Sequence, residues 1–199
     1  MTFLEQWQTH LTKHVGKEVS DKGTTHDYIN AYYAHLFSDR NPNITLVEIG
    51  IGTGLGLVFW TEWFTNAKIF AIEKYPLHYF HKVPFETPGA TSIFADAYIP
   101  ETIDLFEDNS IDYLIDDGPH TLESQLYCLE HWFKKIKPGG KIIIEDIQDI
   151  ERRNNFNNLI YILLNFILNK AFFQFICYTF IIIIIFITGI KRMTWRIAN

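Results

Sequence analysis

The hydrophobic pattern between residues 43 and 146 is a series of short apolar runs, each ending at or near a small or acidic residue. The runs are rich in β-branched residues and apolar at successive positions, which is typical of strands that helices cover on both faces. They are ITLVEIG, AKIFAIE, TSIFADA, IDYLIDD and GKIIIED, at residues 44–50, 67–73, 91–97, 111–117 and 140–146. The pattern therefore predicts strands of a mostly parallel sheet.

The segments between these runs are long enough for crossover helices, and residues 121–140 show the helical pattern best. Thr121 is a suitable N-cap, and Pro138 with the two glycines after it is expected to end the helix. Its apolar face is predicted at Leu122, Leu126, Leu129 and Trp132 or Phe133. Alternating strands and helices predict an α/β fold, a Rossmann-like doubly wound sheet with helices on both faces.

A glycine-rich segment, VEIGIGTGLG at residues 47–56, follows the first strand and precedes a helix. Glycines at alternate positions let the backbone turn sharply and let a ligand approach without meeting a Cβ atom. No start within the segment completes the G-x-G-x-x-G or A fingerprint of dinucleotide-binding proteins, so a nucleoside ligand without a pyrophosphate fits better than NAD. A tight turn of purely structural purpose is the alternative. The glycines are Gly50, Gly52, Gly54 and Gly56.

Three acidic residues stand at the carboxyl ends of the first three strands, where ligands bind in doubly wound sheets. Glu48 lies in the first strand, and Glu73 closes the second, where a carboxylate can accept both ribose hydroxyls. Asp96 closes the third, where it can bind an adenine amino group. Each alone is compatible with an ordinary solvated strand end, but their order beside the glycine segment favours a nucleoside site.

The fourth and fifth strands both end in paired acids. Asp116 and Asp117 open the stretch DDGPH, which His120 closes, and Glu145 and Asp146 end the fifth strand. Carboxylates that converge from neighbouring strands need a cation, and oxygen ligands favour magnesium or calcium over zinc. Glu145 and Asp146 would face opposite sides of an ideal strand, so both can bind one ion only if the strand breaks there. A polar turn without chemistry is the alternative for DDGPH.

These motifs together resemble the class I S-adenosylmethionine-dependent methyltransferases, with EIGIGTG as the cofactor loop, Glu73 as the ribose acid and Asp96 as the adenine-side acid. Within that class the chain is similar to the metal-dependent sugar O-methyltransferases of macrolide biosynthesis, of the macrocin and mycinamicin type. DDGPH, IIIEDI and the upstream segment DKGTTHDYINAYYAHLF carry this narrower resemblance, which covers residues 20–150.

The resemblance implies S-adenosylmethionine as cofactor, and a magnesium ion held by Asp117, Glu145 and Asp146. It also implies His120 as general base and a hydroxyl group of a sugar or other small molecule as methyl acceptor. A metal ion lowers the pKa of a bound hydroxyl, and a neutral imidazole accepts its proton near pH 7. His26, in the upstream segment, is a candidate for binding the acceptor.

Charge and composition exclude some other classes. All 23 acidic residues lie at or before Glu151, so that part carries a net charge of about −12 and the remainder about +6. An acidic body argues against a nucleic-acid substrate. Cys128 and Cys177 have no metal-binding spacing, and the first residues lack a secretory signal pattern, so a cytoplasmic protein is expected. A homo-oligomer is compatible with the sequence. A nicotinamide oxidoreductase is disfavoured by the glycine spacing.

The sequence divides into a helical lead-in (1–40), a cofactor-binding core (41–151) and a hydrophobic tail (152–199) rich in Asn, Ile and Phe. Residues 171–190 are uncharged and long enough to span a membrane. Three interpretations of the tail stay open: a membrane anchor, a segment translated out of the ancestral frame, and a remnant of the last strands of the fold. A tail out of frame would leave a cofactor-binding protein without activity, with the last strands missing or replaced.

Overall fold

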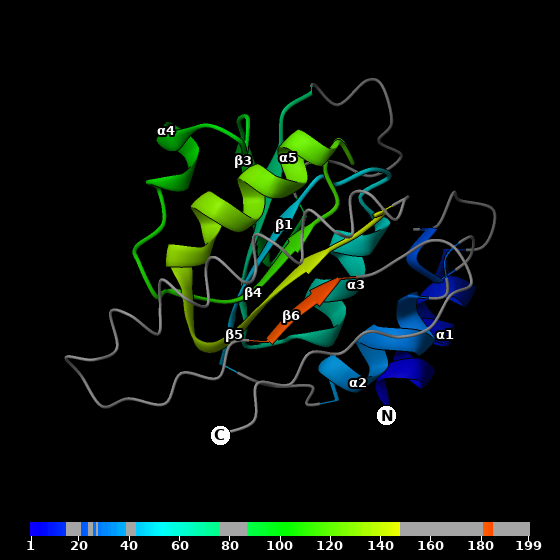
Figure 1. The fold of residues 1–199 in the computed structure, drawn as a ribbon. Helices are drawn as coiled ribbons and strands as arrows, with labels where there is room; N and C mark the ends of the chain where they lie inside the picture. The colour runs from blue at the N-terminus through cyan, green and yellow to red at the C-terminus, as the bar shows by residue number, and fades with distance from the viewer. Residues whose placement is uncertain are drawn as a thin grey trace. The chain divides into compact units, whose positions relative to one another are not determined.

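The computed structural model describes residues 1–14, 21–23, 26, 28–38, 43–75, 87–147 and 181–184 (Figure 1). The chain forms two compact units, residues 1–97 and 98–199. Each contains parallel strands with flanking helices, which is the Rossmann-like α/β architecture that the sequence predicts.

The strands of the first unit are β1 (Thr45–Ile49), β2 (Lys68–Glu73) and β3 (Ala90–Phe94). They pair in parallel in the order β3-β2-β1. The register sets Glu48 opposite Ala71 and Glu73 opposite Phe94. Helix α3 (Leu55–Trp63) follows β1 and is apolar on most of its surface, because it lies inside the core.

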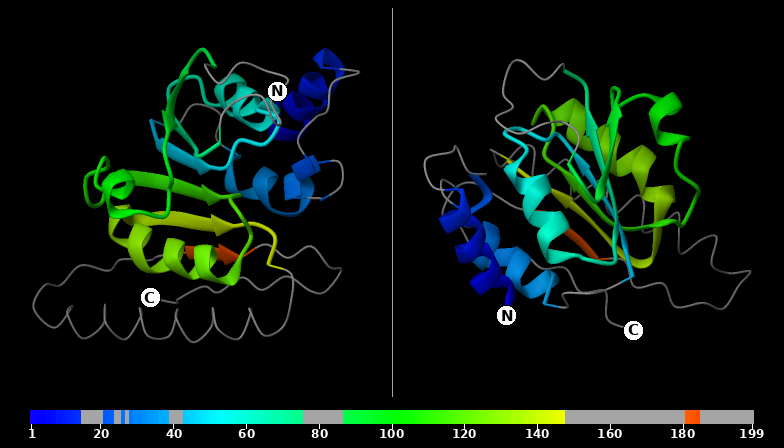
Figure 2. Two further views of the ribbon diagram at one scale, coloured as in Figure 1. Left: turned by 90° about the horizontal axis from the view of Figure 1, so that it is seen from above. Right: turned by 180° about the vertical axis from the view of Figure 1, so that it is seen from behind.

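The lead-in begins with helix α1 (Phe3–Lys13). Thr2 caps it, accepting a hydrogen bond from the Glu5 backbone N–H, while the Glu5 side chain accepts one from the Thr2 N–H. The buried residues of α1 recur at helical spacing and pack against α3, beside which α1 runs in Figure 2. They are Phe3, Gln6, Trp7 and His10.

After α1 the lead-in contains a 3-10 turn (Asp21–Gly23), a π-helical turn (Ile29–Tyr33) and the short helix α2 (Ala34–Leu36). Gly23 lies directly against the indole of Trp7, where a Cβ atom would come within 2.6 Å of the ring nitrogen. A glycine is therefore required for this close approach.

The second unit contains β4 (Ile111–Asp116), β5 (Ile136–Ile144) and β6 (Ile181–Ile184), paired in parallel in that order. Helix α4 (Pro100–Ile103) precedes β4. Helix α5 (Leu122–Tyr127) continues as a π-helical turn (Cys128–Trp132) and a 3-10 turn (Phe133–Lys135) that flank the strands (Figure 2). Thr121 accepts a hydrogen bond from the Ser124 N–H at 3.1 Å, which confirms the predicted N-cap.

The end and the buried face of this helix differ from the prediction. The helical segment ends at Lys135, and Pro138 and the glycines after it lie within β5. Gly139 has a φ of 80° there, and the β4–β5 register shifts between Ile111 and Tyr113, so the Pro-Gly-Gly sequence makes a bulge. Leu122 and Leu126 are only half-buried, and the buried positions are Ser124, Gln125, Cys128, Leu129, Trp132 and Lys135.

Most of the tail, including nearly all of the predicted membrane segment 171–190, lies outside the described residues. Residues 181–184 form β6, which pairs with β5 from Lys141 opposite Ile181 to Ile144 opposite Ile184. These four residues therefore adopt the strand that the third interpretation of the tail expects. Among the described residues no helix has the length and hydrophobicity to cross a membrane.

Candidate functional site

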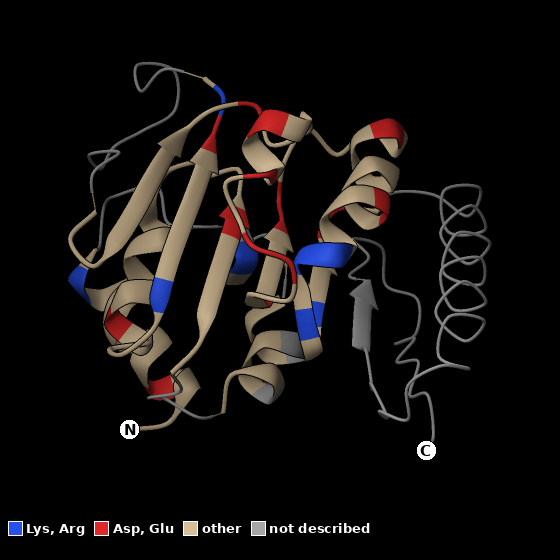
Figure 3. Cartoon of the chain, turned by 90° about the vertical axis from the view of Figure 1, so that its left-hand side faces the viewer, with Lys and Arg blue, Asp and Glu red and all other residues tan. Residues whose placement is uncertain are grey.

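Acidic residues lie at or near the carboxyl ends of strands in each unit, coloured red in Figure 3. β2 ends at Glu73, β4 ends at Asp116, and Glu145 follows directly after β5. The parallel strand direction brings these acids to strand ends, as the sequence predicts.

The glycine loop of the first unit turns tightly between β1 and α3. Gly50, Gly52 and Gly54 have φ angles of 80°, 52° and 79°, in the left-handed region that favours glycine. The Gly54 N–H donates to the Ile51 carbonyl at 2.8 Å, and α3 begins at the next residue. A Cβ atom at Gly52 would meet no atom of the described residues within 4 Å, so this part of the chain leaves room for a ligand at the tip of the loop.

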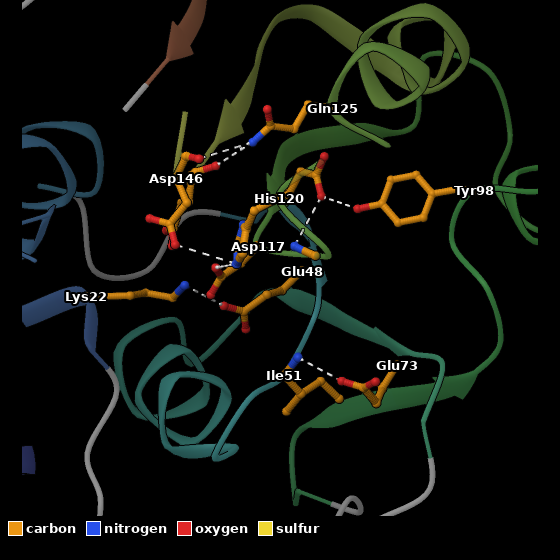
Figure 4. Close-up of polar contacts among 12 residues, drawn as sticks. Lys22, Glu48, Ile51, Glu73, Tyr98, Asp117, His120, Gln125 and Asp146 are labelled. Atoms are coloured by element: carbon orange, nitrogen blue, oxygen red, sulfur yellow. Dashed lines mark hydrogen bonds and ion pairs between the residues drawn. The ribbon is translucent and has the colours of Figure 1, made fainter. Parts of the chain in front are cut away.

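The Glu73 carboxylate is tied to this loop (Figure 4). It accepts hydrogen bonds from the Ile51 N–H at 3.2 Å and the Tyr75 N–H at 2.9 Å. Asp96, two residues beyond β3, pairs with Lys74 at 2.7 Å and raises the pKa of that amine. The structure thus brings Glu73 to the glycine loop and places Asp96 beside the residue that follows Glu73.

Glu48 has partners inside the first unit that the sequence does not reveal. Its buried carboxylate accepts a hydrogen bond from the Trp60 indole N–H at 3.1 Å and lies 3.6 Å from the Lys22 ammonium (Figure 4). Lys22 is itself only 3% exposed. Because a buried charge needs a partner, Lys22 holds the lead-in to β1.

Asp117, His120 and Asp146 form one group in the second unit (Figure 4). His120 Nε2 lies 3.8 Å from Asp117 Oδ1 and 3.5 Å from Asp146 Oδ2. One ligand atom from each residue lies within 4.8 Å of the others. His120 and Asp146 have φ angles of 56° and 61°, which are unusual for residues with a Cβ atom. The backbone has therefore left the strand before Asp146, which the sequence argument requires of a shared ion site.

Glu145 is buried and does not belong to this group. Its backbone N–H donates to the Asp116 carbonyl at 3.0 Å. The Gln125 side-chain amide donates to the Glu145 carbonyl at 3.0 Å and the Asp146 carbonyl at 3.5 Å (Figure 4). Gln125 thus fixes, from α5, the backbone that carries both acids.

Asp116 has a different environment from Asp117. It is 2% exposed, and its Oδ1 accepts hydrogen bonds from the Tyr98 hydroxyl at 2.5 Å and the Gly118 N–H at 3.3 Å. Burial raises the pKa of Asp116 to about 6, and raises the pKa of Tyr98 and Cys128 well above their usual ranges. The first aspartate of DDGPH is therefore a buried anchor, and the second belongs to the group with His120 and Asp146.

His26, the predicted acceptor-binding residue, is half-buried in the first unit, and its ring stacks on that of Tyr28 at 5.1 Å between centroids. Tyr98, Gln125 and Lys22 are the site residues that the sequence argument missed. Each of these residues acts through a contact with a residue distant in the sequence, so no motif or spacing along the chain could have revealed its role.

Comparison with known proteins identifies the family. Residues 47–147 match a family model described as a methyltransferase domain. The chain belongs to this methyltransferase domain family. The match begins in β1 and ends just after the acids of β5, so it spans the glycine loop and the DDGPH stretch. The predicted membership of the methyltransferases is confirmed at the level of this family.

The curated relatives that the chain matches include two named as O-methyltransferases. The chain is 28% identical over 138 residues to the 8-demethyl-8-alpha-L-rhamnosyl tetracenomycin-C 2'-O-methyltransferase of Streptomyces olivaceus, covering 65% of this chain and 35% of the relative. It is 26% identical over 139 residues to the demethylmacrocin O-methyltransferase of Streptomyces fradiae, covering 63% and 33%. The chain spans about a third of the length of these relatives.

A solved structure shares the fold. The MycE methyltransferase from the mycinamycin biosynthetic pathway, determined with Mg, SAH and mycinamycin VI, superposes with a TM-score of 0.55 at 22% identity. The alignment covers 73% of this chain and 39% of the MycE chain. At this identity the likeness is one of fold.

Proposed function

We propose that this chain transfers a methyl group from S-adenosylmethionine to a hydroxyl group of a sugar or other small molecule, and that a bound magnesium ion assists the transfer. Family membership supports the methyl transfer. The convergence of Asp117, His120 and Asp146 supports the choice of a hydroxyl acceptor, because carboxylates and an imidazole are the groups that hold a cation and remove a proton.

The first unit binds the cofactor in this proposal. The open space at Gly52 accommodates the nucleoside, and the Glu73 carboxylate accepts hydrogen bonds from the ribose hydroxyls. Asp96 binds on the adenine side. Glu48 supports β1 from within through Lys22 and Trp60, since its carboxylate is already engaged by them.

The second unit holds the metal ion and the acceptor. Asp117 and Asp146 supply convergent carboxylate oxygens, which would fit magnesium. Glu145, the third acid that the sequence predicts as a ligand, is buried and lies outside this group. Magnesium, when bound, lowers the pKa of an acceptor hydroxyl. Gln125 keeps the backbone of both β5 acids in place.

His120 accepts the proton at Nε2, where the neighbouring carboxylates stabilise the imidazolium that results. The acceptor oxygen loses its proton to His120 and forms a bond to the methyl carbon, while the carbon–sulfur bond breaks. The electron pair of the broken carbon–sulfur bond stays on sulfur, and S-adenosylhomocysteine is the second product. No oxidant or reductant is needed.

Calorimetric titration of the chain with S-adenosylmethionine tests the cofactor half. Glu73→Ala should weaken binding by about 1–3 kcal/mol, the cost of leaving ribose hydroxyls unpaired. Glu107→Ala, at an exposed acid of the second unit, is the matched control and should bind normally. Tighter binding of NAD than of S-adenosylmethionine would contradict the proposal.

Turnover with a panel of rhamnosides tests the other half, because the Streptomyces olivaceus relative is named for a rhamnosyl compound. Asp117→Ala or excess EDTA should abolish turnover and leave cofactor binding intact. His120→Ala should lower kcat by roughly 10² to 10⁴. His131→Ala, at an exposed histidine, is the control. Cofactor binding without turnover on any hydroxyl acceptor would favour a binding protein instead.

A further inference from the structure

A second group of potential metal ligands lies in the first unit, away from the glycine loop acids and from the DDGPH stretch. It consists of His10 on α1, His14 at the C-cap of α1, and Glu62 on α3. His10 and His14 are four residues apart, so their side chains project from the same face of α1. That face packs against α3, which carries Glu62.

The three side chains converge in a largely buried space. His10 is completely buried, and His14 is 8% exposed. His10 Nδ1 lies 2.9 Å from Glu62 Oε2, and the two imidazole rings lie 4.6 Å apart between centroids. One ligand atom from each of the three residues lies within 4.8 Å of the others. Within the described part of the chain, the His10 Nε2 atom is buried without a hydrogen-bond partner.

The charges suit a cation. Burial lowers the pKa of His10 and so favours the neutral imidazole, which is the form that binds metals. Lys13 contacts the other oxygen of Glu62, but its side chain is 60% exposed and can turn into solvent. An incoming cation would therefore meet a neutral imidazole and a carboxylate whose present counter-ion is displaceable.

We propose that His10, His14 and Glu62 bind a divalent transition-metal ion, with Zn²⁺ as the probe. Two imidazoles and one carboxylate are a recurring ligand set for zinc, whereas oxygen-only sets suit magnesium. Around a tetrahedral zinc with bonds of about 2.1 Å, ligand atoms lie roughly 3.4 Å apart. His10 and Glu62 are already closer than this, at 2.9 Å, and the ligand atoms of the remaining pairs lie within 4.8 Å of one another.

Such an ion would link α1 to α3 and hold the lead-in on the first unit. The competing explanation is that Glu62 only accepts a hydrogen bond from His10 and pairs with Lys13. The two explanations differ in the effect of Lys13. If Glu62 is a metal ligand, the ammonium competes with the ion, and Lys13→Gln should strengthen zinc binding.

The test is calorimetric titration of the full chain with ZnCl₂ in the Asp117→Asn/Asp146→Asn background, which removes the carboxylates of the other group. Further substitutions are added to this background. His14→Gln should weaken zinc binding roughly 100-fold or more, beyond the 10- to 100-fold cost of losing an outer-shell partner. Glu62→Gln should act in the same direction, Lys13→Gln in the opposite one, and His131→Gln, at an exposed histidine, should change nothing.

Circular dichroism checks that each variant remains folded. Thermal melting gives a second readout, because an ion that binds only the folded state raises Tm. Zinc should raise the Tm of the background protein and fail to raise that of His14→Gln. Absence of zinc binding at micromolar concentration in the background, or zinc binding that His14→Gln leaves unchanged, would overturn the proposal.

Discussion

The contact between Tyr98, Asp116 and Gly118 leads to a double-mutant prediction in the second unit. Tyr98→Phe removes the hydroxyl that donates to Asp116 at 2.5 Å and leaves the Gly118 N–H, at 3.3 Å, as a donor to that oxygen. Asp116 is 2% exposed with a pKa of about 6, so at pH 8 it is a buried anion. Losing a hydrogen bond to a buried charged group should lower the free energy of unfolding by about 2–3 kcal/mol.

Gly118→Ala should also break the hydrogen bond from the Tyr98 hydroxyl to Asp116, because the added Cβ atom takes the place of the hydroxyl. A Cβ atom at this position would lie 2.1 Å from the Tyr98 hydroxyl oxygen, and 3.1 Å from both Tyr98 Cζ and Asp116 Oδ1. The hydroxyl must move away, so the variant loses the Asp116 hydrogen bond and gains overpacking of about 1 kcal/mol. We expect a total cost of about 3–4 kcal/mol.

In the Tyr98→Phe background the hydroxyl is already absent, so Gly118→Ala should cost only about 1 kcal/mol. The coupling between the two substitutions is therefore about 2 kcal/mol or more. Urea unfolding at pH 8, followed by circular dichroism, gives the four free energies, with Tyr75→Phe at an exposed tyrosine as control. Additivity within about 0.5 kcal/mol would refute the contact.

Three further predictions concern buried partners and a helix cap. Lys22→Met should lower the free energy of unfolding by about 3–5 kcal/mol, because it removes the ammonium that faces the buried Glu48 carboxylate. Adding Glu48→Gln should recover part of this loss, as measured by urea unfolding. In Cys177→Ser protein, the Cys128 thiol should react with DTNB roughly 100-fold more slowly in the native state than in urea, since burial raises its pKa, and equal rates would contradict this. Thr2→Ala removes the cap of α1 and should lower Tm, by the equivalent of about 1 kcal/mol.

The five strands were predictable because each contains a run of apolar residues, the pattern of strands covered on both faces. β3 is the exception in its burial, since none of its residues is fully buried. The glycine loop and the acids at strand ends followed from the same pattern, since parallel strands place their carboxyl ends together. The Pro-Gly-Gly bulge was not predictable in this way. Pro138 and Gly139 commonly end a helix, and only the register of β5 on β4 shows that they lie within a strand.

The different environments of the two aspartates in DDGPH were also not predictable from the sequence. Asp116 and Asp117 are identical residues in adjacent positions, and the alternation of a strand turns one inward and leaves the other at its end. The hydrogen bond from Tyr98 identifies Asp116 as the buried aspartate, but Tyr98 lies in a loop, and no sequence pattern connects that loop to β4. The spacing of His10 and His14 was visible in the sequence, whereas Glu62 becomes their neighbour only when α1 packs on α3.

The left-handed backbone at His120 and Asp146 has a consequence for how this chain would respond to selection. A residue with a Cβ atom in that conformation costs about 1–2 kcal/mol relative to glycine. A library scored only for resistance to heat should therefore enrich glycine at both positions, trading chemistry for stability. A library scored for methyl transfer should keep the imidazole and the carboxylate and accept the lower melting temperature. In these two loops, the substitution that stabilises the fold removes a group that the proposed reaction needs.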